Sequence, residues 1–455
     1  MLTADPNSCG RCWIQSMRNK STSEVINALL LTAYFPPDTG SAAHLFYELG
    51  KALVGHGHQV TVITGMPGYY AQGSLERYKG RKWIKEKIKG MEVVRVATPQ
   101  LPRHLMVARA LWQFSGAVAF FLASLRLAHY DVAMVYSPPL PLGLTAWALH
   151  KVRGVPFVLN VQDLFPQSII DLGLLKNSWL IRLFEAMERF VYRQADAITV
   201  HSEGNRQHVT EKCRKGEGGE VERKRGIGIK VEVISNWVDT DFIRPGERMN
   251  GFRQKHGLGD SFIISFAGVL GYSQDLDVVL EAAGLVNHQP YSFARQPVTW
   301  LIVGDGVERT RLEEKARAMK LCNVRFLPMQ PREKYPEVLS ASDVCLATLH
   351  EEVKTPVVPS KILSIMAAAR PVVAAMDLEG DAPKFIAEAD CGICVPPGDA
   401  GALADAIMKL YQNRSLCQEL GRNGRRYAEK HLLLETAVRK YEELFSKIIE
   451  HRNSP

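Results

Sequence analysis

The chain has 455 residues, of which 46% are hydrophobic and 23% are charged. This length and composition predict a soluble globular protein of two or three domains with a large core. The net charge of +8 is modest and locally clustered, and no nucleic-acid-binding motif is present. The charge therefore favours an anionic surface or an anionic substrate, and no nucleic-acid partner is expected.

Residues 1–24 are polar, lack periodicity and contain no apolar run. We expect a disordered extension or an over-extended start there, and no signal peptide. The apolar run Ile26–Thr32 then predicts a buried parallel strand. A loop with Gly40 and Ser41 leads from it into a helix over Ala42–His56, and a strand, a glycine-containing loop and a helix N-terminus together form a ligand crevice in α/β proteins. The loop does not match the GxGxxG dinucleotide fingerprint.

A basic loop and an apolar helix come next. Residues 79–89 carry six lysine or arginine side chains and Trp83, opposed only by Glu86. They predict either a solvated face or a contact with anionic lipids. Residues 105–127 form the most apolar helix, but its charge-free segment Ala110–Leu125 is shorter than the ~20 residues that span a bilayer. We therefore expect a buried or interfacial helix, and with the basic loop a membrane-surface contact.

Strands alternate with helices through the rest of the first half, which predicts a doubly wound parallel sheet. The strands are expected at Val132–Tyr136, Pro156–Val161 and Ala197–His201, and the helices at Leu140–Val152 and Trp179–Gln194.

Polar side chains follow these strands where each one ends. They are Ser137, Gln162, Asp163 and His201. Because ligands bind at the carboxyl ends of strands in open α/β sheets, these residues are candidates for one site. Asp163 also has an ordinary alternative role as the cap of a helix that begins near Pro166.

The middle of the chain reads as a connection between two domains. Residues 212–230 mix charges with glycines and predict a flexible surface insertion. A short strand, Val231–Ile234, is followed by Asn236, which suits a turn conformation. Residues 241–260 lack an apolar period, contain Pro245 and are interpreted as the interdomain linker.

A second α/β series begins at Ser261, and three closing helices are predicted over Ala400–Tyr411, Ser415–Lys430 and Glu435–His451. Its strands are expected at Phe262–Ala267, Thr299–Val303, Val324–Leu327, Val344–Leu349, Pro371–Ala375 and Gly392–Val395.

Three turns at one edge of this second sheet suit a phosphate group. Gly268-Val-Leu-Gly271 leads through Gln274 into a helix, and Gly304-Asp-Gly306 follows the next strand. Pro359-Ser360-Lys361 opens a helix of small residues, Ile362–Ala369, and places an ammonium group beside free backbone N–H groups. An ordinary helix start would look similar at Lys361, but three such loops together indicate a nucleotide site.

The eight cysteines include two CxxC pairs, Cys9–Cys12 and Cys391–Cys394. Two pairs of this kind could bind zinc. The second pair lies in an apolar strand pattern, however, and this favours buried thiols in a reducing cytosol.

The order and spacing of these motifs resemble glycosyltransferase family 4, the group 1 glycosyl transferases of the GT-B fold. The resemblance extends from Ile26 to Ile449 and includes NWVD after the linker strand, GVLG, GDG, PSK and VPPGDAGALADAI. The runs YSPPLPL from Tyr136 and VQDLFPQ from Val161 resemble the branch that builds exopolysaccharide, capsule, lipopolysaccharide or O-antigen units.

The resemblance implies two tandem doubly wound Rossmann-like domains that face each other across a cleft. Residues 25–240 would bind the acceptor, and residues 261–434 would bind the nucleotide sugar. The linker would be 241–260, and the last helix, 435–451, would cross back to the first domain.

The implied reaction moves a sugar from a UDP- or GDP-sugar to a lipid-linked glycan acceptor, with retention of configuration and without a metal or cofactor. The enzyme would lie in the cytoplasm, peripherally associated with the inner face of the plasma membrane through 79–89 and 105–127. The implied catalytic residues are Asp163 and Gln162, and the acceptor would meet Ser137, His201 and Asn236. The implied donor site is Gly40, Ser41, Gly268, Gly271, Gln274, Gly304, Gly306, Lys361 and Ser364.

The chain departs from the family pattern at three places. Many members carry two glutamates where this chain has Pro356 and Ser364, and a His-Asp pair where it has Gln162 and Asp163. A basic pair is replaced by residues 273–275. Two alternative functions therefore stay open from the sequence, namely a sugar-nucleotide epimerase of the same fold and a non-catalytic nucleotide or glycan binder.

Overall fold

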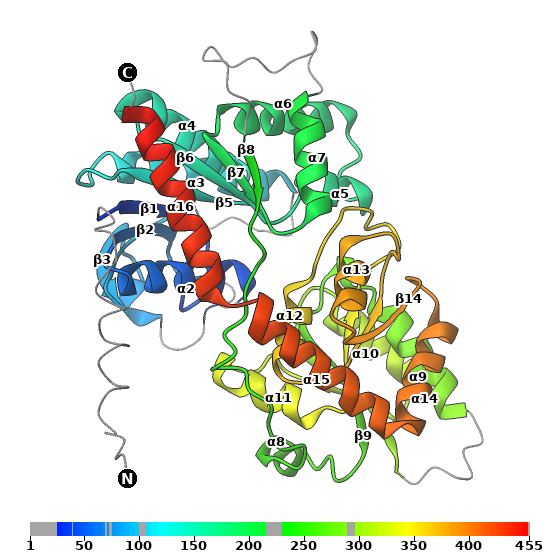
Figure 1. The fold of residues 1–455 in the computed structure, drawn as a ribbon. Coiled ribbons are helices and arrows are strands. Elements are labelled where there is room, and N and C mark those ends of the chain that lie inside the picture. Colours follow the sequence, from blue (N-terminus) through cyan, green and yellow to red (C-terminus); the bar gives the residue numbers. More distant parts are fainter. Residues whose placement is uncertain are drawn as a thin grey trace, which may run out of the picture.

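The computed structural model describes residues 25–38, 40–68, 71, 75–99, 106–214, 230–288 and 296–453. Within them the chain forms two α/β domains, each built on its own sheet (Figure 1). The expectations for residues 1–24, for Cys9 and Cys12 and for most of the insertion at 212–230 lie outside the described residues.

The first sheet has eight strands in the order β3-β4-β2-β1-β5-β6-β7-β8, and all neighbours except β3 and β4 run parallel. Every residue of β5 and β6 is buried, as expected for parallel strands covered on both faces. The strands are β1 (Asn27–Leu31), β2 (Gln59–Gly65), β3 (Trp83–Ile88), β4 (Met91–Val96), β5 (Val132–Ser137), β6 (Phe157–Val161), β7 (Ala197–Val200) and β8 (Lys230–Val233).

The basic segment 79–89 is not simply a loop, because most of it forms the antiparallel edge strand β3. Lys85 and Lys87 point to solvent, while Glu86 turns inward and pairs with the buried Arg95. Lysines are common on edge strands because they discourage pairing with other chains. The many charges of this segment mask its two-residue alternation, so the sequence alone predicts a loop.

Helices cover both faces of the first sheet. On one face α3, α4, α6 and α7 share a core with the strands, and on the other α2 and α16 do so. The helices of this domain are α2 (Ser41–Gly55), α3 (Met106–Ser124), α4 (Pro141–Arg153), α5 (Gln167–Asp171), α6 (Ser178–Gln194) and α7 (Glu203–Arg214). None of the helices within the described ranges has both the length and the apolarity needed to cross a bilayer.

The second sheet has six parallel strands in the order β11-β10-β9-β12-β13-β14. These are β9 (Phe262–Val269), β10 (Val298–Asp305), β11 (Val324–Leu327), β12 (Val344–Thr348), β13 (Val372–Ala375) and β14 (Gly392–Val395). The helices of this domain are α8 (Gly251–Lys255), α9 (Leu276–His288), α10 (Arg309–Ala318), α11 (Tyr335–Ala341), α12 (Ser360–Ala367), α13 (Asp381–Glu388), α14 (Ala400–Gln412) and α15 (Arg414–His431).

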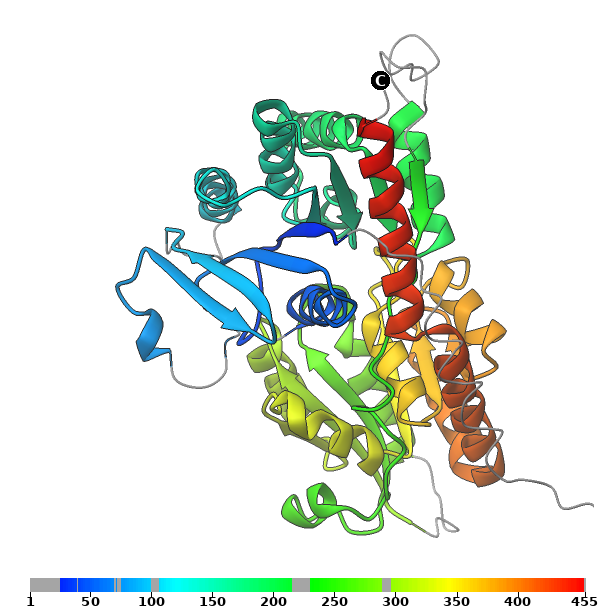
Figure 2. The same cartoon turned by 60° about the vertical axis from the view of Figure 1, so that its left-hand side comes forward.

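The chain ends by returning to the first domain. Helix α15 lies on the second domain, and α16 (Leu434–Asn453) then packs beside α2 (Figure 2). Val438, Tyr441 and Phe445 of α16 are buried in the same core as β1 and β2. The last helix therefore fastens the two domains together.

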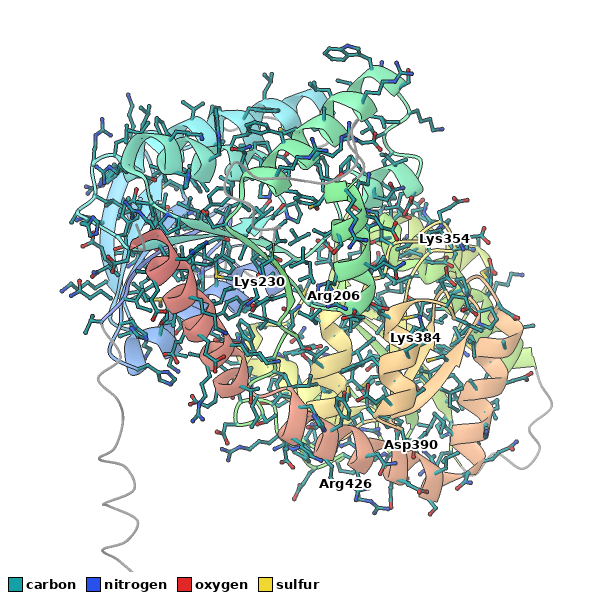
Figure 3. All side chains as sticks on the ribbon, turned by 45° about the horizontal axis from the view of Figure 1, so that its top comes forward. Arg206, Lys230, Lys354, Lys384, Asp390 and Arg426 are labelled. Atoms are coloured by element: carbon teal, nitrogen blue, oxygen red, sulfur yellow. The ribbon has the colours of Figure 1, made fainter. Side chains whose placement is uncertain are left out.

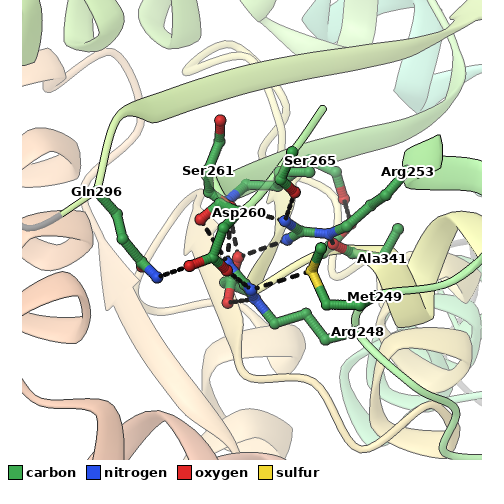
Figure 4. Close-up of polar contacts among 12 residues, drawn as sticks. Arg248, Met249, Arg253, Asp260, Ser261, Ser265, Gln296 and Ala341 are labelled. Atoms are coloured by element: carbon green, nitrogen blue, oxygen red, sulfur yellow. Dashed lines mark hydrogen bonds and ion pairs between the residues drawn. The ribbon is translucent and has the colours of Figure 1, made fainter. Parts of the chain in front are cut away.

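The expected linker, 241–260, is less irregular than its sequence suggests. Phe252 and Arg253 of α8 are buried in the second domain. Arg253 donates to Asp343 Oδ2 at 2.9 Å and to the backbone oxygens of Ser261 and Ala341 (Figure 4). Arg248 bonds Asp343 as well, at 2.7 Å. Polar anchoring of this kind leaves no apolar period, so it cannot be recognised in the sequence.

The buried pair of Arg253 and Asp343 makes a stability prediction. Arg253→Ala removes the buried cation that pairs with Asp343, a carboxylate only 9% exposed, and leaves it paired with Arg248. Loss of one partner of a buried pair costs about 3–5 kcal/mol of unfolding free energy, and the remaining pair with Arg248 places the expected loss near the lower end of this range. Urea unfolding should show a loss of this size for the second domain.

The matched control is Arg244→Ala, because Arg244 and Asp241 form an exposed ion pair. Exposed pairs contribute little, so this variant should unfold like the wild type. Equal stability of both variants would show that the Arg253 network does not hold the linker.

Candidate active site

The carboxyl ends of β5, β6 and β7 bring the polar residues of the first domain to one edge. Ser137, Gln162 and His201 are buried there, whereas Asp163 reaches solvent. Asp163 is nevertheless crowded by neighbouring groups, and this desolvation raises the pKa of its carboxyl group. A carboxylate with a raised pKa at a sheet edge is suited to accept a proton.

The Gln162 side chain is held by the protein itself. Its Nε2 donates to Asn160 Oδ1 at 3.0 Å and to Asn236 Oδ1 at 3.1 Å, and its Oε1 accepts from Asn236 Nδ2 at 2.8 Å. Asn160 Nδ2 in turn donates to the Tyr441 hydroxyl of α16 at 3.1 Å. Gln162 and Asn236 therefore tie the strand end beside Asp163 to the connection between the domains.

His201 lies at a contact between the domains. Gly204 N at the start of α7 donates to Asp381 Oδ2 of α13 at 2.7 Å, and Ser202 Oγ donates to the Pro356 oxygen at 3.5 Å. In Figure 3 the labelled side chain of Arg206 marks α7, and that of Lys384 marks α13. Burial lowers the pKa of His201 to about 4, although Asp381 opposes the shift. The imidazole is thus neutral at physiological pH.

Lys361 is the central cation of the second domain's edge. The structure starts α12 at Ser360, so Lys361 lies in its first turn. Its Nζ lies 3.9 Å from the centre of the Phe266 ring and hydrogen-bonds Gln274 Oε1. No ion pair to this amine is formed by any carboxylate in the parts of the chain the structure describes. Crowding in this partly open position lowers the pKa of Lys361 to about 7.

Gly268 leaves room at this cation, and Gly271, three residues later, faces open space. A Cβ atom added to Gly268 would lie 3.9 Å from Lys361 Nζ, and one added to Gly271 would meet nothing within 4 Å. The loop thus brings Gly268, Gln274 and Lys361 together, as expected from the sequence.

Gly304 and Gly306, which the sequence places in the donor site, have a packing role in the structure. A Cβ atom on Gly304 would lie 1.9 Å from the Gly268 oxygen, and one on Gly306 would lie 2.3 Å from the Leu270 oxygen. These glycines let the loops after β9 and β10 touch, so they shape the site through packing.

The other expected donor residues lie on both domains. Gly40 caps α2 with φ at 117°, and Ser41 is the first residue of that helix. Ser364 is on α12, beside the Tyr335 hydroxyl. Pro356, at the place of the other missing glutamate, contacts α7 through its backbone oxygen.

One interdomain contact had no signal in the sequence. Arg332 pairs with Glu48 of α2 and approaches His44 Nδ1 at 3.2 Å, while Trp237 Nε1 donates to Glu48 at 2.9 Å. Burial, with a smaller effect of Arg332, lowers the pKa of His44 to about 4. This contact joins α2, the connection between the domains and the second domain.

A cavity of about 230 Å³ lies where the domains meet. Its one lining residue from the first domain is Leu172, just after α5. The second domain contributes Gly271, Tyr272, Asp275, Leu276, Asp277, Glu308, Arg311, Leu312 and His350.

The second CxxC pair gives no sign of metal binding within the described residues. Cys391 and Cys394 are free thiols, and burial raises their pKa values to about 12 and about 11. No group of three or more histidine, cysteine or acidic side chains suited to a metal ion occurs in the described part of the chain.

The two kinds of glycine make a paired prediction. Gly304→Ala forces its new methyl group against the Gly268 carbonyl, so we expect a loss of about 1–3 kcal/mol in unfolding free energy. Gly271→Ala has open space and an extended backbone, so its unfolding free energy should stay near that of the wild type. Urea unfolding of both variants checks this. If Gly304→Ala were as stable as Gly271→Ala, the loops would not be packed as described.

Comparison with known proteins agrees with this geometry. Residues 249–427 match the model of "Glycosyl transferases group 1", and residues 39–217 match that of a "Glycosyl transferase 4-like domain". The chain is 28% identical over 315 residues to the probable glycosyltransferase WbjE of Pseudomonas aeruginosa, covering 69% of this chain and 74% of that protein. It is 27% identical over 420 residues to WcaI of Escherichia coli K12, provisionally named a colanic acid biosynthesis glycosyl transferase, covering 90% and 96%.

Solved structures share the fold. Sucrose-phosphate synthase of Thermosynechococcus elongatus superposes with a TM-score of 0.72 at 17% identity, over 94% of this chain and all of that one. HepE of Anabaena, in complex with UDP-glucose, superposes with a TM-score of 0.65 at 16% identity, over 93% and 100%. The two matched domains, each built on its own largely parallel sheet, show that this chain belongs to the group 1 glycosyltransferases of family 4, has the GT-B fold and is a glycosyltransferase.

Proposed function

We propose that this glycosyltransferase moves a sugar from a UDP- or GDP-sugar to a lipid-linked glycan acceptor during synthesis of a cell-surface polysaccharide. The observation that carries the proposal is the grouping of Lys361, Gln274 and Gly268 on the second domain, with the carboxylate of Asp163 on the first. A relative named for colanic acid biosynthesis and a neighbour crystallised with UDP-glucose support the acceptor class and the donor class.

The donor diphosphate is assigned to the cation of Lys361. When the bond between the anomeric carbon and the phosphate oxygen breaks, negative charge grows on the leaving diphosphate. The Lys361 ammonium and the N-terminal N–H groups of α12 would stabilise that charge. Stabilisation of the leaving diphosphate, which a metal ion could otherwise provide, is thus assigned to the Lys361 ammonium and the helix dipole of α12.

Asp163 is assigned to the acceptor. Its carboxylate would hold the acceptor hydroxyl, whose oxygen forms the new bond to the anomeric carbon, and would receive the hydroxyl proton. Gln162 is better placed to position this strand end, through Asn160 and Asn236, than to contact the sugar. Retention of configuration requires attack from the face that the diphosphate leaves, and we propose this course by resemblance to the family.

Membrane attachment is proposed for the first domain. Helix α3 exposes Leu111, Phe114, Val118 and Leu122 on one side, without a charged side chain among them. The lysine-bearing strand β3 lies near the C-terminal end of α3. There the guanidinium carbon of Arg126 lies 5.8 Å from the centre of the Trp83 ring of β3. Apolar and basic residues together suit the inner face of an anionic cytoplasmic membrane.

The proposed transfer is tested by donor turnover. The purified enzyme is incubated with bacterial membrane lipids and radiolabelled UDP- and GDP-sugars, and both released nucleotide and label in the lipid extract are measured. Asp163→Asn should lower label transfer about 100-fold or more, as expected for loss of a base. Asp405→Asn, at an exposed position of α14, is the matched control and should transfer normally. Donor isomerisation without nucleotide release would contradict the proposal.

The raised pKa of Asp163 predicts a pH profile. A base must be deprotonated, so kcat/KM should fall as the pH is lowered through a pKa that lies above the ordinary value for aspartate. The residual activity of Asp163→Asn should lack this acidic limb. If wild type and Asp163→Asn showed the same fall in kcat/KM at low pH, the titrating group would not be Asp163.

A further inference from the structure

Helix α6 carries an exposed apolar stripe that its own domain does not use. Trp179, Leu183 and Phe190 are 67%, 46% and 37% exposed, and their spacing places them on one side of the helix. The opposite side is already packed, since Val191 and Tyr192 are fully buried in the core. The stripe is therefore additional to what folding requires.

The charges on α6 are arranged asymmetrically around this stripe. Arg182 is exposed between Trp179 and Leu183. The two carboxylates of the helix are turned away, since Glu188 is buried beside Lys212 and Glu185 pairs with Lys212. Tryptophan, leucine and arginine without an exposed acid are typical of a helix that lies in the interface of an anionic bilayer.

The stripe continues across neighbouring helices. Trp147 of α4 contacts Phe190 edge to face, with ring centres 5.1 Å apart. On its other side α4 packs on α3, where Thr145 Oγ1 donates to the Ala117 oxygen at 2.8 Å. Val152 of α4 is also exposed. Single apolar residues are ordinary on a surface, but the contact of Phe190 with Trp147 extends the exposed apolar stripe from α6 onto α4.

The same surface leads to the candidate active site. Leu174, just before α6, is exposed, and Leu172 lines the cavity between the domains. On the other side of this turn Phe165, two residues after Asp163, contacts Phe184 of α6 at 5.3 Å between ring centres. A membrane on this surface would lie beside the opening of the cleft.

We infer that the outward face of α6 is a second bilayer-docking surface, distinct from α3 and β3, which binds anionic lipid and holds the cleft opening at the membrane. The inference rests on the proposed lipid-linked acceptor, whose reacting hydroxyl must reach Asp163 while its lipid stays in the bilayer. An anionic bilayer fits the stripe because it offers an apolar layer for Trp179 and Leu183 and phosphates for Arg182.

The test is co-sedimentation with vesicles of phosphatidylcholine, with and without one third phosphatidylglycerol. Wild type should bind the anionic vesicles. Trp179→Ser with Leu183→Ser should weaken that binding about tenfold or more, because the apolar area that enters the bilayer is lost. The matched control is Leu285→Ser on α9 of the second domain, a position of similar exposure to Leu183, and it should bind like the wild type. Unchanged melting temperature and donor binding show that the double variant is folded.

A second readout reports contact directly. Vesicles with brominated acyl chains should quench part of the wild-type tryptophan fluorescence, and Trp179→Phe should remove that part. Val118→Ser with Leu122→Ser tests α3 separately. If the α3 variant alone weakens binding, or if wild type binds no vesicles, the inference about α6 is overturned.

Two further outcomes distinguish bilayer docking from self-association and from the acceptor assignment. If wild type sediments as a dimer, the α6 variant is a monomer and vesicle binding is unchanged, α6 is a self-association surface and the inference is overturned. If α6-dependent vesicle binding is found but no label enters lipid, the docking surface stands and the lipid-linked acceptor of the proposed function fails.

Discussion

The candidate site depends on one cation that has no anionic partner among the described residues. The Lys361 amine lies over Phe266 at the start of α12, bonded to the neutral Gln274 and not to a carboxylate among the described residues. An ammonium group held in this way loses part of its hydration without compensation, and this lowers its pKa to about 7. A diphosphate would supply the missing negative charge. The proposed nucleotide-sugar donor would account for a lysine at this position.

The rest of the fold places this cation and Asp163 each at the edge of its own domain where the strands end. Gly304 and Gly306 let two loops touch, and this contact fixes the loop that carries Gln274. The connection between the domains is held at both ends, by Asn236 to Gln162 and by Arg253 to Asp343. Helix α16 then crosses back and inserts its own side chains into the first core.

Much of this arrangement follows from local sequence patterns. Apolar runs ending in turns predict the parallel strands, and the ends of those strands predict where Asp163 and Lys361 lie. Local patterns do not reveal which residues far apart in the sequence contact each other. Arg332 and Glu48 are 284 positions apart, and neither has a neighbour that marks it. The strand β3 was missed because lysines occupy its outer positions, and the packing roles of Gly304 and Gly306 appear only when two loops are placed side by side. The identities of the donor and the acceptor depend on loop shapes, and these are set by contacts between distant residues of the same kind.

The most direct test of the central claim is proton-linked nucleotide binding. UDP and GDP are titrated by calorimetry at pH 8 in buffers of different ionisation enthalpy, which gives the protons taken up per nucleotide bound. With a pKa of about 7, Lys361 is mostly neutral at this pH, and a bound diphosphate raises its pKa. We predict uptake of about one proton for the better nucleotide, together with an affinity that falls as the pH rises above about 7, and the loss of both effects in Lys361→Met. Tight binding with no proton uptake, or uptake that persists in Lys361→Met, would contradict the assignment of the diphosphate to Lys361.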